Sequence, residues 1–549
     1  MPINKRVRGG ASGQHQFARA PQAKVPRSKF NRSHSHKTTF NEGFLVPIFV
    51  DEMLPGDSFK LNMNAFARLA TPLFPLMDNM YLETFFFAVP NRLLWSNWER
   101  FNGAREPSDP LPSPGVNDFI IPQLTFDAAV SVSSIGDYFG LPLTSAPVAS
   151  SSVRCSSLPF RAYNLIFNEW FRDEDLQDSL TVNLGDGPDN LSSYNLVRRG
   201  KRHDYFTSCR PWPQKAAPVT IPLGESAPVL LNPDSTNGVL LKRAADDANP
   251  ITSGSATLST TYDTPNQNCF FNVTGQGTAL EIDPNGSLIA DLNDATAASI
   301  NDLRLAFQTQ KLFEKDARGG TRYTEIIDSH FGVVSPDSRL QRPEYLGGGS
   351  TPVVVNPVAS TVRGSAAPVA NSPLGDLGAY GVCAPHNHGF SYTAKEHCVL
   401  LGLVTVRADL NYQQGLERMW QRRTRYDFYW PVFSHLGEQA VLNSEIFFSA
   451  STNNDVFGYQ ERYAEYRYKP SRISGLFRSN AAQSLDSWHL AQDFATLPAL
   501  NASFIEEDAP MKRIKATTTD PDFIFDSFFH MTCVRPMPVY SVPGWIDHF

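Results

Sequence analysis

The clearest hydrophobic pattern lies between Asn79 and Trp95, in the run NMYLETFFFAVPNRLLW. Successive side chains of a strand point to opposite faces, and here both faces are mostly apolar. The two faces consist of Tyr81, Glu83, Phe85, Phe87 and Val89, and of Met80, Leu82, Thr84, Phe86 and Ala88. Such a strand lies inside a sandwich or barrel, or has its second face sealed by another chain. The pattern predicts a central strand of an all-β core, ended by Pro90.

Further strands are predicted near both ends of the chain. Cys398–Ala408 is again apolar on both faces, whereas Phe59–Leu69 alternates between apolar and largely polar positions. The remaining predicted strands are Phe44–Val50, Tyr426–Phe433, Glu445–Ser449, Tyr463–Tyr468 and Phe523–Val534. Two sets of strands that flank a loop-rich middle predict a mainly β sandwich of the jelly-roll type, which tolerates long insertions between strands.

The middle of the chain holds the predicted helices and loops. Leu158–Asp173 and Ile300–Arg318 carry apolar stripes at helical spacing, and Thr321–His330 follows as a shorter helix. Residues 335–390 contain a glycine triplet at 347–349 and many prolines, and we expect them to form loops.

Composition points toward large contact surfaces. Aromatic residues make up 12% of the 549 residues, and charged residues 19%, below the roughly 25% of ordinary soluble domains. Contacts between subunits would account for this balance, and a dense monomeric core is the alternative. The six cysteines form no CxxC pair, so we expect buried thiols in a reducing cytosol. No secretory signal or membrane-spanning run is found in the sequence.

Charge is distributed very unevenly. Residues 1–41 contain nine cations and no acid, whereas residues 42–549 carry 39 basic and 55 acidic groups. We predict that 1–41 is a flexible arm that binds a polyanion, with rings spaced to stack on the bases of single-stranded nucleic acid. A tail that only aids solubility is the alternative. The candidate DNA-binding residues are Lys5, Arg6, Arg8, Phe17, Arg19, Lys24, Arg27, Lys29, Phe30, Arg32 and Lys37.

Residues 217–298 differ in amino-acid composition from the rest of the chain. They are rich in Ser, Thr, Asn, Asp and Gly, and their only cations are Lys242 and Arg243. We predict an insertion that projects from the surface of a single domain covering 42–549. Its acids, such as Asp291 and Asp294, lack the ligand spacing of a calcium loop and are typical of turns.

Motifs for catalysis or cofactor binding are not found. The sequence holds no phosphate-binding loop, no HExxH and no G-x-S-x-G. His386 and His388, with Glu396 and His397, come nearest to a metal site, but the pair lies in a turn sequence, so ordinary polar roles are favoured. We therefore predict no catalytic residue, no metal and no cofactor.

Several long blocks resemble the major capsid protein of gokushovirus-type microviruses. They include FNEGFLVPIFVDEMLPGD (40–57), TFFFAVPNRLLWSNWERFNG (84–103), LPFRAYNLIFNEWFRD (158–173), RGKRHDYFTS (199–208), DARGGTRYTEIIDSHFGV (316–333), RYKPSRISG (467–475) and RPMPVYSVPGWIDHF (535–549). The blocks appear in order along most of the chain, except at about 217–298 and 352–385.

The resemblance implies an eight-stranded jelly roll and a sixty-copy icosahedral shell around circular single-stranded DNA. It implies that neighbouring subunits cover apolar surface that one molecule cannot hide, and that 217–298 projects at the three-fold axes toward the bacterial host. A small basic DNA-binding protein, a pilot protein and a host receptor are the implied partners, with assembly in the host cytoplasm and residence in the virion. A bacterial jelly-roll carbohydrate-binding protein or hydrolase is the competing prediction, and a sequence-specific DNA regulator lacks a helix-turn-helix signal.

Overall fold

The computed structural model describes residues 26–104, 119–148, 154–220, 300–361, 375–449 and 452–540, with six short strands between 229 and 290. The chain divides into two compact units, of which the first comprises Met1–Pro213 with Ala317–Phe549 and the second comprises Gln214–Asp316.

The second unit contains the predicted insertion. Its short strands pair as β8 with β13, β9 with β12 and β10 with β11. Their bounds are Val229–Leu231 (β8), Leu241–Arg243 (β9), Leu258–Asp263 (β10), Asn268–Val273 (β11), Leu280–Ile282 (β12) and Leu288–Ala290 (β13). Helix α4, Ile300–Gly319, begins in this unit, and Leu303 and Phe307 of its predicted stripe are exposed. The acids considered for calcium, Asp291 and Asp294, lie outside the described residues.

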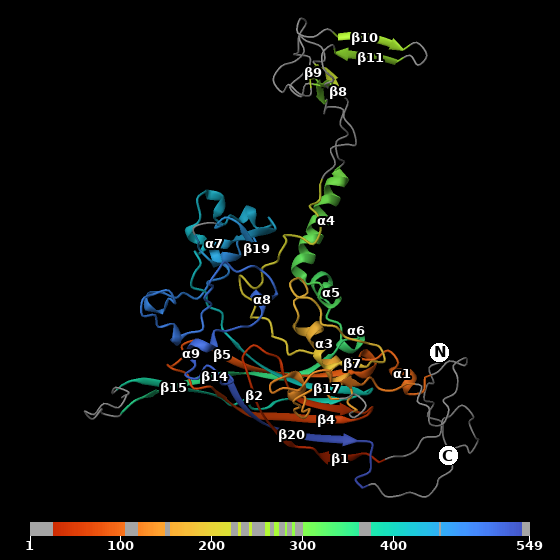
Figure 1. Ribbon diagram of the computed structural model, residues 1–549, viewed down its shortest axis with the longest axis vertical. Helices are drawn as coiled ribbons and strands as arrows, with labels where there is room; N and C mark the ends of the chain where they lie inside the picture. Colours follow the sequence, from red (N-terminus) through yellow and green to blue (C-terminus); the bar gives the residue numbers. More distant parts are fainter. Residues whose placement is uncertain are drawn as a thin grey trace, which may run out of the picture. The chain divides into compact units, whose positions relative to one another are not determined.

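Ten strands of the first unit form one antiparallel sheet that curls over on itself (Figure 1). The spatial order is β1, β20, β4, β15, β14, β5, β17 and β3, while β2 also pairs with β20 and β16 with β4. Their bounds are Ser28–Asn31 (β1), His34–Phe40 (β2), Val46–Met53 (β3), Ser58–Leu69 (β4), Met80–Pro90 (β5), Glu344–Ala359 (β14), Leu377–Cys383 (β15), His388–Thr393 (β16), Cys398–Ala408 (β17) and Phe523–Arg535 (β20). The predicted mainly β, jelly-roll-type fold is confirmed.

The long strand β14 divides this sheet into two halves. Its first part pairs with β5 and its last part, from Val354, pairs with β15. We call β3, β17, β5 and the first part of β14 the covered half, and β1, β2, β20, β4, β15 and β16 the open half. Phe49 of β3 and Phe529 of β20 belong to different halves, yet their ring centroids are 5.3 Å apart. The halves therefore pack face to face around one apolar core.

The outer face of the covered half is buried by the same chain. Helix α3, Leu158–Ile166, and the π-helical turn Phe167–Phe171 lie over it (Figure 1). Phe87 packs against Trp170 and Phe171, with ring centroids 5.6 and 6.0 Å apart. The prediction of a central strand at 79–95 is confirmed. Of the two alternatives for its second face, the one in which another chain seals it does not apply, because α3 and the loops around it already cover that face.

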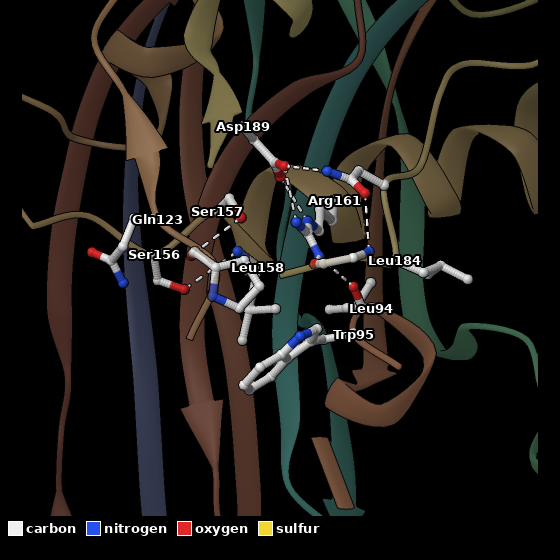
Figure 2. A network of polar contacts seen from close by, with 12 residues as sticks. Leu94, Trp95, Gln123, Ser156, Ser157, Leu158, Arg161, Leu184 and Asp189 are labelled. Atoms are coloured by element: carbon white, nitrogen blue, oxygen red, sulfur yellow. Dashed lines mark hydrogen bonds and ion pairs between the residues drawn. The ribbon is translucent and has the colours of Figure 1, made fainter. Parts of the chain in front are cut away.

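A buried ion pair fastens this cover (Figure 2). The Arg161 side chain is fully buried and meets Asp189 in a two-pronged contact, Nε to Oδ2 at 2.6 Å and Nη2 to Oδ1 at 2.9 Å. Nη1 of Arg161 also donates to the carbonyls of Leu94 and Gly185. Tyr194 donates its hydroxyl to Asp189. Burial raises the pKa of Asp189, but these hydrogen bonds and the Arg161 charge hold it below its ordinary value. The pair is satisfied on all sides, as a buried charge requires.

The region predicted as loop over 335–390 contains three strands. β14 was missed because of its glycines, which are rare in strand interiors. Glycine is needed here because neighbouring atoms of β5 and β16 lie very close to the β14 backbone. A Cβ at Gly348 would lie 2.0 Å from the Thr84 carbonyl oxygen, and one at Gly349 would lie 2.5 Å from the His388 ring. A side chain at either position would therefore clash with β5 or with β16 unless the backbone moved.

Three predicted strands near the C-terminal half are wrong. Residues 426–433 form 3₁₀ turns at Arg425–Asp427 and Pro431–Phe433, and Tyr463–Tyr468 contains a 3₁₀ turn at Ala464–Tyr466. The strand predicted at 445–449 overlaps the short helix Asn443–Ile446 (α7). Short aromatic runs resemble strands in sequence, and only pairing partners distinguish them.

The remaining elements are short, except for α5. The helices are Trp98–Phe101 (α1), Ile135–Tyr138 (α2), Tyr323–Phe331 (α5), Asp337–Leu340 (α6), Asn443–Ile446 (α7), Ala502–Ile505 (α8) and Met511–Ile514 (α9). The strands are Leu124–Thr125 (β6), Asp189–Asn190 (β7), Glu438–Leu442 (β18) and Val456–Glu461 (β19).

Candidate nucleic-acid interface

The open half of the sheet presents an exposed outer face. Strand β20 alternates strictly between buried and exposed positions over most of its length, and β4 alternates between buried positions and half-buried or exposed ones. The cross-strand register places the exposed positions on one surface. We use the name open face for the part of this surface on β1, β2, β4 and β20, which includes Lys29, Asn31, Ser35, Lys37, Thr39, Lys60, Asn62, Asn64, Phe66, Arg68, Ile524, Asp526, Phe528, His530 and Thr532.

The open face is cationic although the chain as a whole is acidic. Four of its residues are Lys or Arg and one is an acid, whereas the chain has 48 basic and 55 acidic residues. The acid, Asp526, lies 3.2 Å from Lys37, and both side chains are mostly exposed. An exposed pair of this kind is worth about 0–1 kcal/mol and leaves both groups accessible.

Six of the residues predicted to bind DNA lie outside the described residues. These are Lys5, Arg6, Arg8, Phe17, Arg19 and Lys24.

The other five belong to a folded region rather than to a flexible arm. Lys29 and Phe30 lie in β1 and Lys37 in β2, and both strands pair with β20. Arg32 meets Asp51 in a two-pronged contact at 2.6 and 3.0 Å, and Arg27 donates to the Gly56 carbonyl. Residues 28–40 are therefore part of the sheet for most of their length, because β20 supplies the backbone partners that the sequence could not reveal.

The sheet register separates these five residues by role. Lys29 and Lys37 point outward on the open face. Phe30 lies opposite buried Cys533 and points to the other side. Arg32 is held by Asp51. The open face thus brings together two predicted residues and does not include Phe30 or Arg32.

The aromatic residues of the open face were missed as site residues. Phe66, Phe528 and His530 lie on strands that were predicted, and their exposed positions follow the period of two. The signal was a large ring at a position expected to face water. The pairing of β4 with β20 brings these rings onto one surface, and no sequence pattern shows that pairing.

A cavity of about 920 Å³ on the outer side of β5 and β17 is lined largely by charged side chains. Glu83 accepts hydrogen bonds from Arg199 and, at 3.0 Å, from Nη2 of Arg407. Burial raises the pKa of Glu83, but the two guanidinium groups outweigh burial and hold it below its ordinary value. Burial lowers the pKa of Arg199 to about 10. These charged groups pair with one another, and their ion pairs link β5 and β17 to the segment around Arg199.

A second exposed surface lies at residues 419–436, which we call the aromatic segment. Its exposed large side chains are Met419, Trp420, Tyr426, Phe428, Tyr429, Trp430, Val432 and Leu436. Arginines stack on its rings, with Arg422 over Phe428 at 5.2 Å and Arg425 over Tyr426 at 5.3 Å. Trp, Tyr, Phe, Met and Arg are the residues enriched in protein–protein interfaces.

His388, which is buried and was considered for a metal, has other partners. Nδ1 of His388 lies 2.8 Å from the Thr84 hydroxyl, and Nε2 lies 3.0 Å from that of Thr351. Burial, with a smaller contribution from His386, lowers the pKa of His388. Glu396 pairs with Arg92. Within the described residues, His, Cys, Asp and Glu form no group of three or more that could hold a metal ion.

Two further findings concern the described part of the chain. Cys155, Cys209, Cys383, Cys398 and Cys533 are unpaired, and all of them are buried except Cys155, which is half-buried. None of the helices in the described ranges is long and apolar enough to cross a membrane.

Comparison with known proteins identifies the family. The family model "Capsid protein (F protein)" matches residues 18–545. Capsid protein VP1 of Bdellovibrio phage phiMH2K is 46% identical, with 98% of this chain and 99% of the relative aligned. Capsid protein VP1 of Chlamydia phage 1 is 43% identical, over 96% and 97% of the two chains, and that of Spiroplasma virus 4 is 34% identical over the same shares.

These matches confirm the resemblance to the microvirus capsid and leave the competing prediction of a lectin or hydrolase without support. A capsid protein associates with copies of itself and resides in the virion. The chain therefore belongs to the capsid (F) protein family and is a structural subunit of a viral shell rather than an enzyme.

Proposed function

We propose that the chain assembles into a sixty-copy icosahedral shell around circular single-stranded DNA. The observation that carries this proposal is the separation of charge within a capsid-family sequence. Residues 1–41 hold nine cations and no acid, and the rest of the chain is acidic. Basic segments neutralise phosphates and release counterions, so a cationic arm favours an interior nucleic acid.

The strand that follows these residues in the sequence supports the same proposal. Residues 1–25 precede β1, which pairs with β20 at the edge of the cationic open face. A basic segment that precedes β1 would bind the same nucleic acid as Lys29 and Lys37 on the sheet. This arrangement supports one continuous basic surface.

Contacts between subunits are the second part of the proposal. The aromatic segment exposes many large rings and arginines, a composition that marks the centre of protein interfaces. In a shell, these side chains would bury much of their surface against a second copy. Assembly would take place in the cytoplasm of the bacterial host.

Further partners are proposed because the positive charge of residues 1–41 is too small to neutralise a genome. Sixty copies of the nine cations in residues 1–41 would neutralise only a minority of the phosphates of a viral genome, so a small basic DNA-binding protein would supply further charge. A pilot protein of the same virus is a further proposed partner.

The insertion at 217–298 is proposed to contact a receptor on the bacterial surface. Its polar, turn-rich composition and its place in a separate compact unit support this role. Exchange of this insertion for that of a relative should change adsorption to host cells, and an unchanged host range would contradict the proposal.

The arm is tested by changing its charge and keeping its length. Lys5, Arg6, Arg8, Arg19 and Lys24 are replaced by Gln, so that β1 and β2 remain intact. We expect particles with reduced DNA content, measured by absorbance ratio and sedimentation. The matched control exchanges Lys and Arg at the same five positions and should package normally.

Two outcomes would count against the role in packaging. Full DNA content in the Gln variant would contradict it. Failure of the Gln variant to assemble, while the charge-conserving control assembles, would assign the arm to subunit contacts instead.

A further inference from the structure

The open face differs from an ordinary solvent-facing sheet in its apolar content. Phe66, Phe528 and Ile524 are 51%, 41% and 57% exposed. On β2, β4 and β20 the rings stand among polar and cationic side chains, while exposed Val354 and Tyr380 continue the same surface beyond Arg68. A face meant for close packing against another protein would hide its charges or pair them. Here Lys60 and Arg68 project beside the rings without an acid directly opposite on β20.

The charges of the open face are complementary to a polyanion. Lys29, Lys37, Lys60 and Arg68 are spread over three strands, and Asp526 is the single acid among them. Lys60 lies opposite Thr532 and Arg68 opposite Ile524, at the two ends of the β4–β20 ladder. The cations therefore border the rings at both ends of the ladder, as phosphates on either side of stacked bases would require.

The rings are arranged so that bases can reach them. Phe528 and His530 lie on one strand, with ring centroids 4.6 Å apart and planes at 64°. Phe66 lies opposite Asp526, one diagonal step from Phe528, a distance of about 7–8 Å on one face of a sheet. Asn64 and Asn62 lie opposite Phe528 and His530 and supply amides beside each ring. Amides of this kind donate to and accept from the edges of unpaired bases.

We infer that the open face is a binding platform for single-stranded DNA, on which bases stack on Phe66 and Phe528 while phosphates lie along Lys60, Arg68 and Lys37. Duplex DNA would not suit it, because paired bases keep their faces inside the helix. The inference rests on the proposal that the shell encloses single-stranded DNA, and it adds a folded surface to the arm. Because stacking is tolerant of sequence, the platform binds without base specificity.

Photocrosslinking of intact particles tests the inference. Particles are irradiated at a wavelength that couples bases to nearby side chains, the DNA is digested, and nucleotide adducts are located by mass spectrometry of peptides. We expect adducts on the peptides that contain Phe66 and Phe528. Adducts confined to residues 1–27, which precede the sheet, would overturn the platform and keep the arm. DNA-containing particles without adducts on this chain would overturn both, and particles without DNA would overturn the proposed function itself.

A double variant, Phe66→Ala with Phe528→Ala, supplies the second measurement. Its matched control is Phe331→Ala, because Phe331 is an exposed phenylalanine away from the open face. We expect both to form particles, with the adduct yield on β4 and β20 reduced about fivefold or more in the double variant only. An unchanged yield on these strands would overturn the platform. Failure of the double variant to form particles, while the control forms them, would also overturn it by showing that the face is a subunit contact.

Discussion

The two halves of the sheet differ in what lies on their outer faces. The outer face of the covered half is buried by α3 and the loops around it, in a second apolar cluster that includes Phe87 and Leu401. The outer face of the open half is exposed and cationic. The burial patterns of the strands reflect this difference. Both faces of β5 and β17 are mostly apolar and buried, whereas β4 and β20 alternate between buried positions and more exposed ones. A strand apolar on both sides therefore indicates a layer from its own chain, and an alternating one leaves a face for a partner.

The difference also indicates which face of the sheet is accessible to a binding partner. Rings on the covered half contribute to the stability of the single molecule, because they are buried before any partner arrives. Rings on the open half contribute little until something covers them. The predictions below separate these two contributions.

The largest effect should come from paired phenylalanine truncations on the two outer faces. Phe87→Ala removes a ring that packs on Trp170 and Phe171, and we expect a loss of about 3–5 kcal/mol in the free energy of unfolding. Phe528→Ala on the open face should change it by no more than about 0.5 kcal/mol. Denaturant unfolding of the purified chain measures both. Equal effects at the two positions would show that the halves do not differ as described.

A smaller effect is expected from the ion pairs of the two halves. Asp189→Asn leaves the buried Arg161 charge without its counterion and should cost about 3 kcal/mol. Asp526→Asn on the open face breaks the exposed contact with Lys37 and should cost less than about 1 kcal/mol. Thermal unfolding midpoints of the two variants give the comparison. A mild effect of Asp189→Asn would mean that the cover over β5 is held by apolar packing alone.

The third prediction concerns the point at which the chain crosses from the open half to the covered half. Glu42 lies between β2 and β3 and is 3% exposed. Burial raises the pKa of its carboxyl from 4.5 to about 8, although a hydrogen bond from the Ala509 amide opposes this. The folded chain then keeps a proton that the unfolded chain releases. Stability from this group is complete below about pH 4.5 and is lost as pH rises toward 8.

Glu42→Gln removes this titration. Between pH 5 and 8 the variant should lose less stability than the natural chain, by up to about 1.4 kcal/mol for each pH unit. Buried Glu507, whose pKa is also raised by burial, should leave part of the dependence in place. Unfolding midpoints across this pH range test the prediction, with exposed Glu52→Gln as the control. Parallel pH profiles for all three proteins would contradict it.

Sequence patterns predicted the strands with strong periodicity and missed those without it. Cys398–Ala408 matches β17 at both ends, and Phe523–Val534 differs from β20 by one residue. β14 was hidden by glycines that its neighbours require, and β1 and β2 were hidden in a basic segment whose partner lies at the other end of the chain. The aromatic segment imitated a strand because its rings have high strand propensity, although its backbone turns.

The sequence by itself determined which strand faces are apolar, where the cations gather, and to which family the chain belongs, because these depend on residue type and local spacing. Only the tertiary structure decided that α3 covers β5, that β14 joins the two halves, and that Lys37, Lys60, Phe66 and Phe528 share one face. A period of two fixes the side on which a side chain lies. The partner strand is fixed by packing between segments far apart in the chain, which no local pattern records.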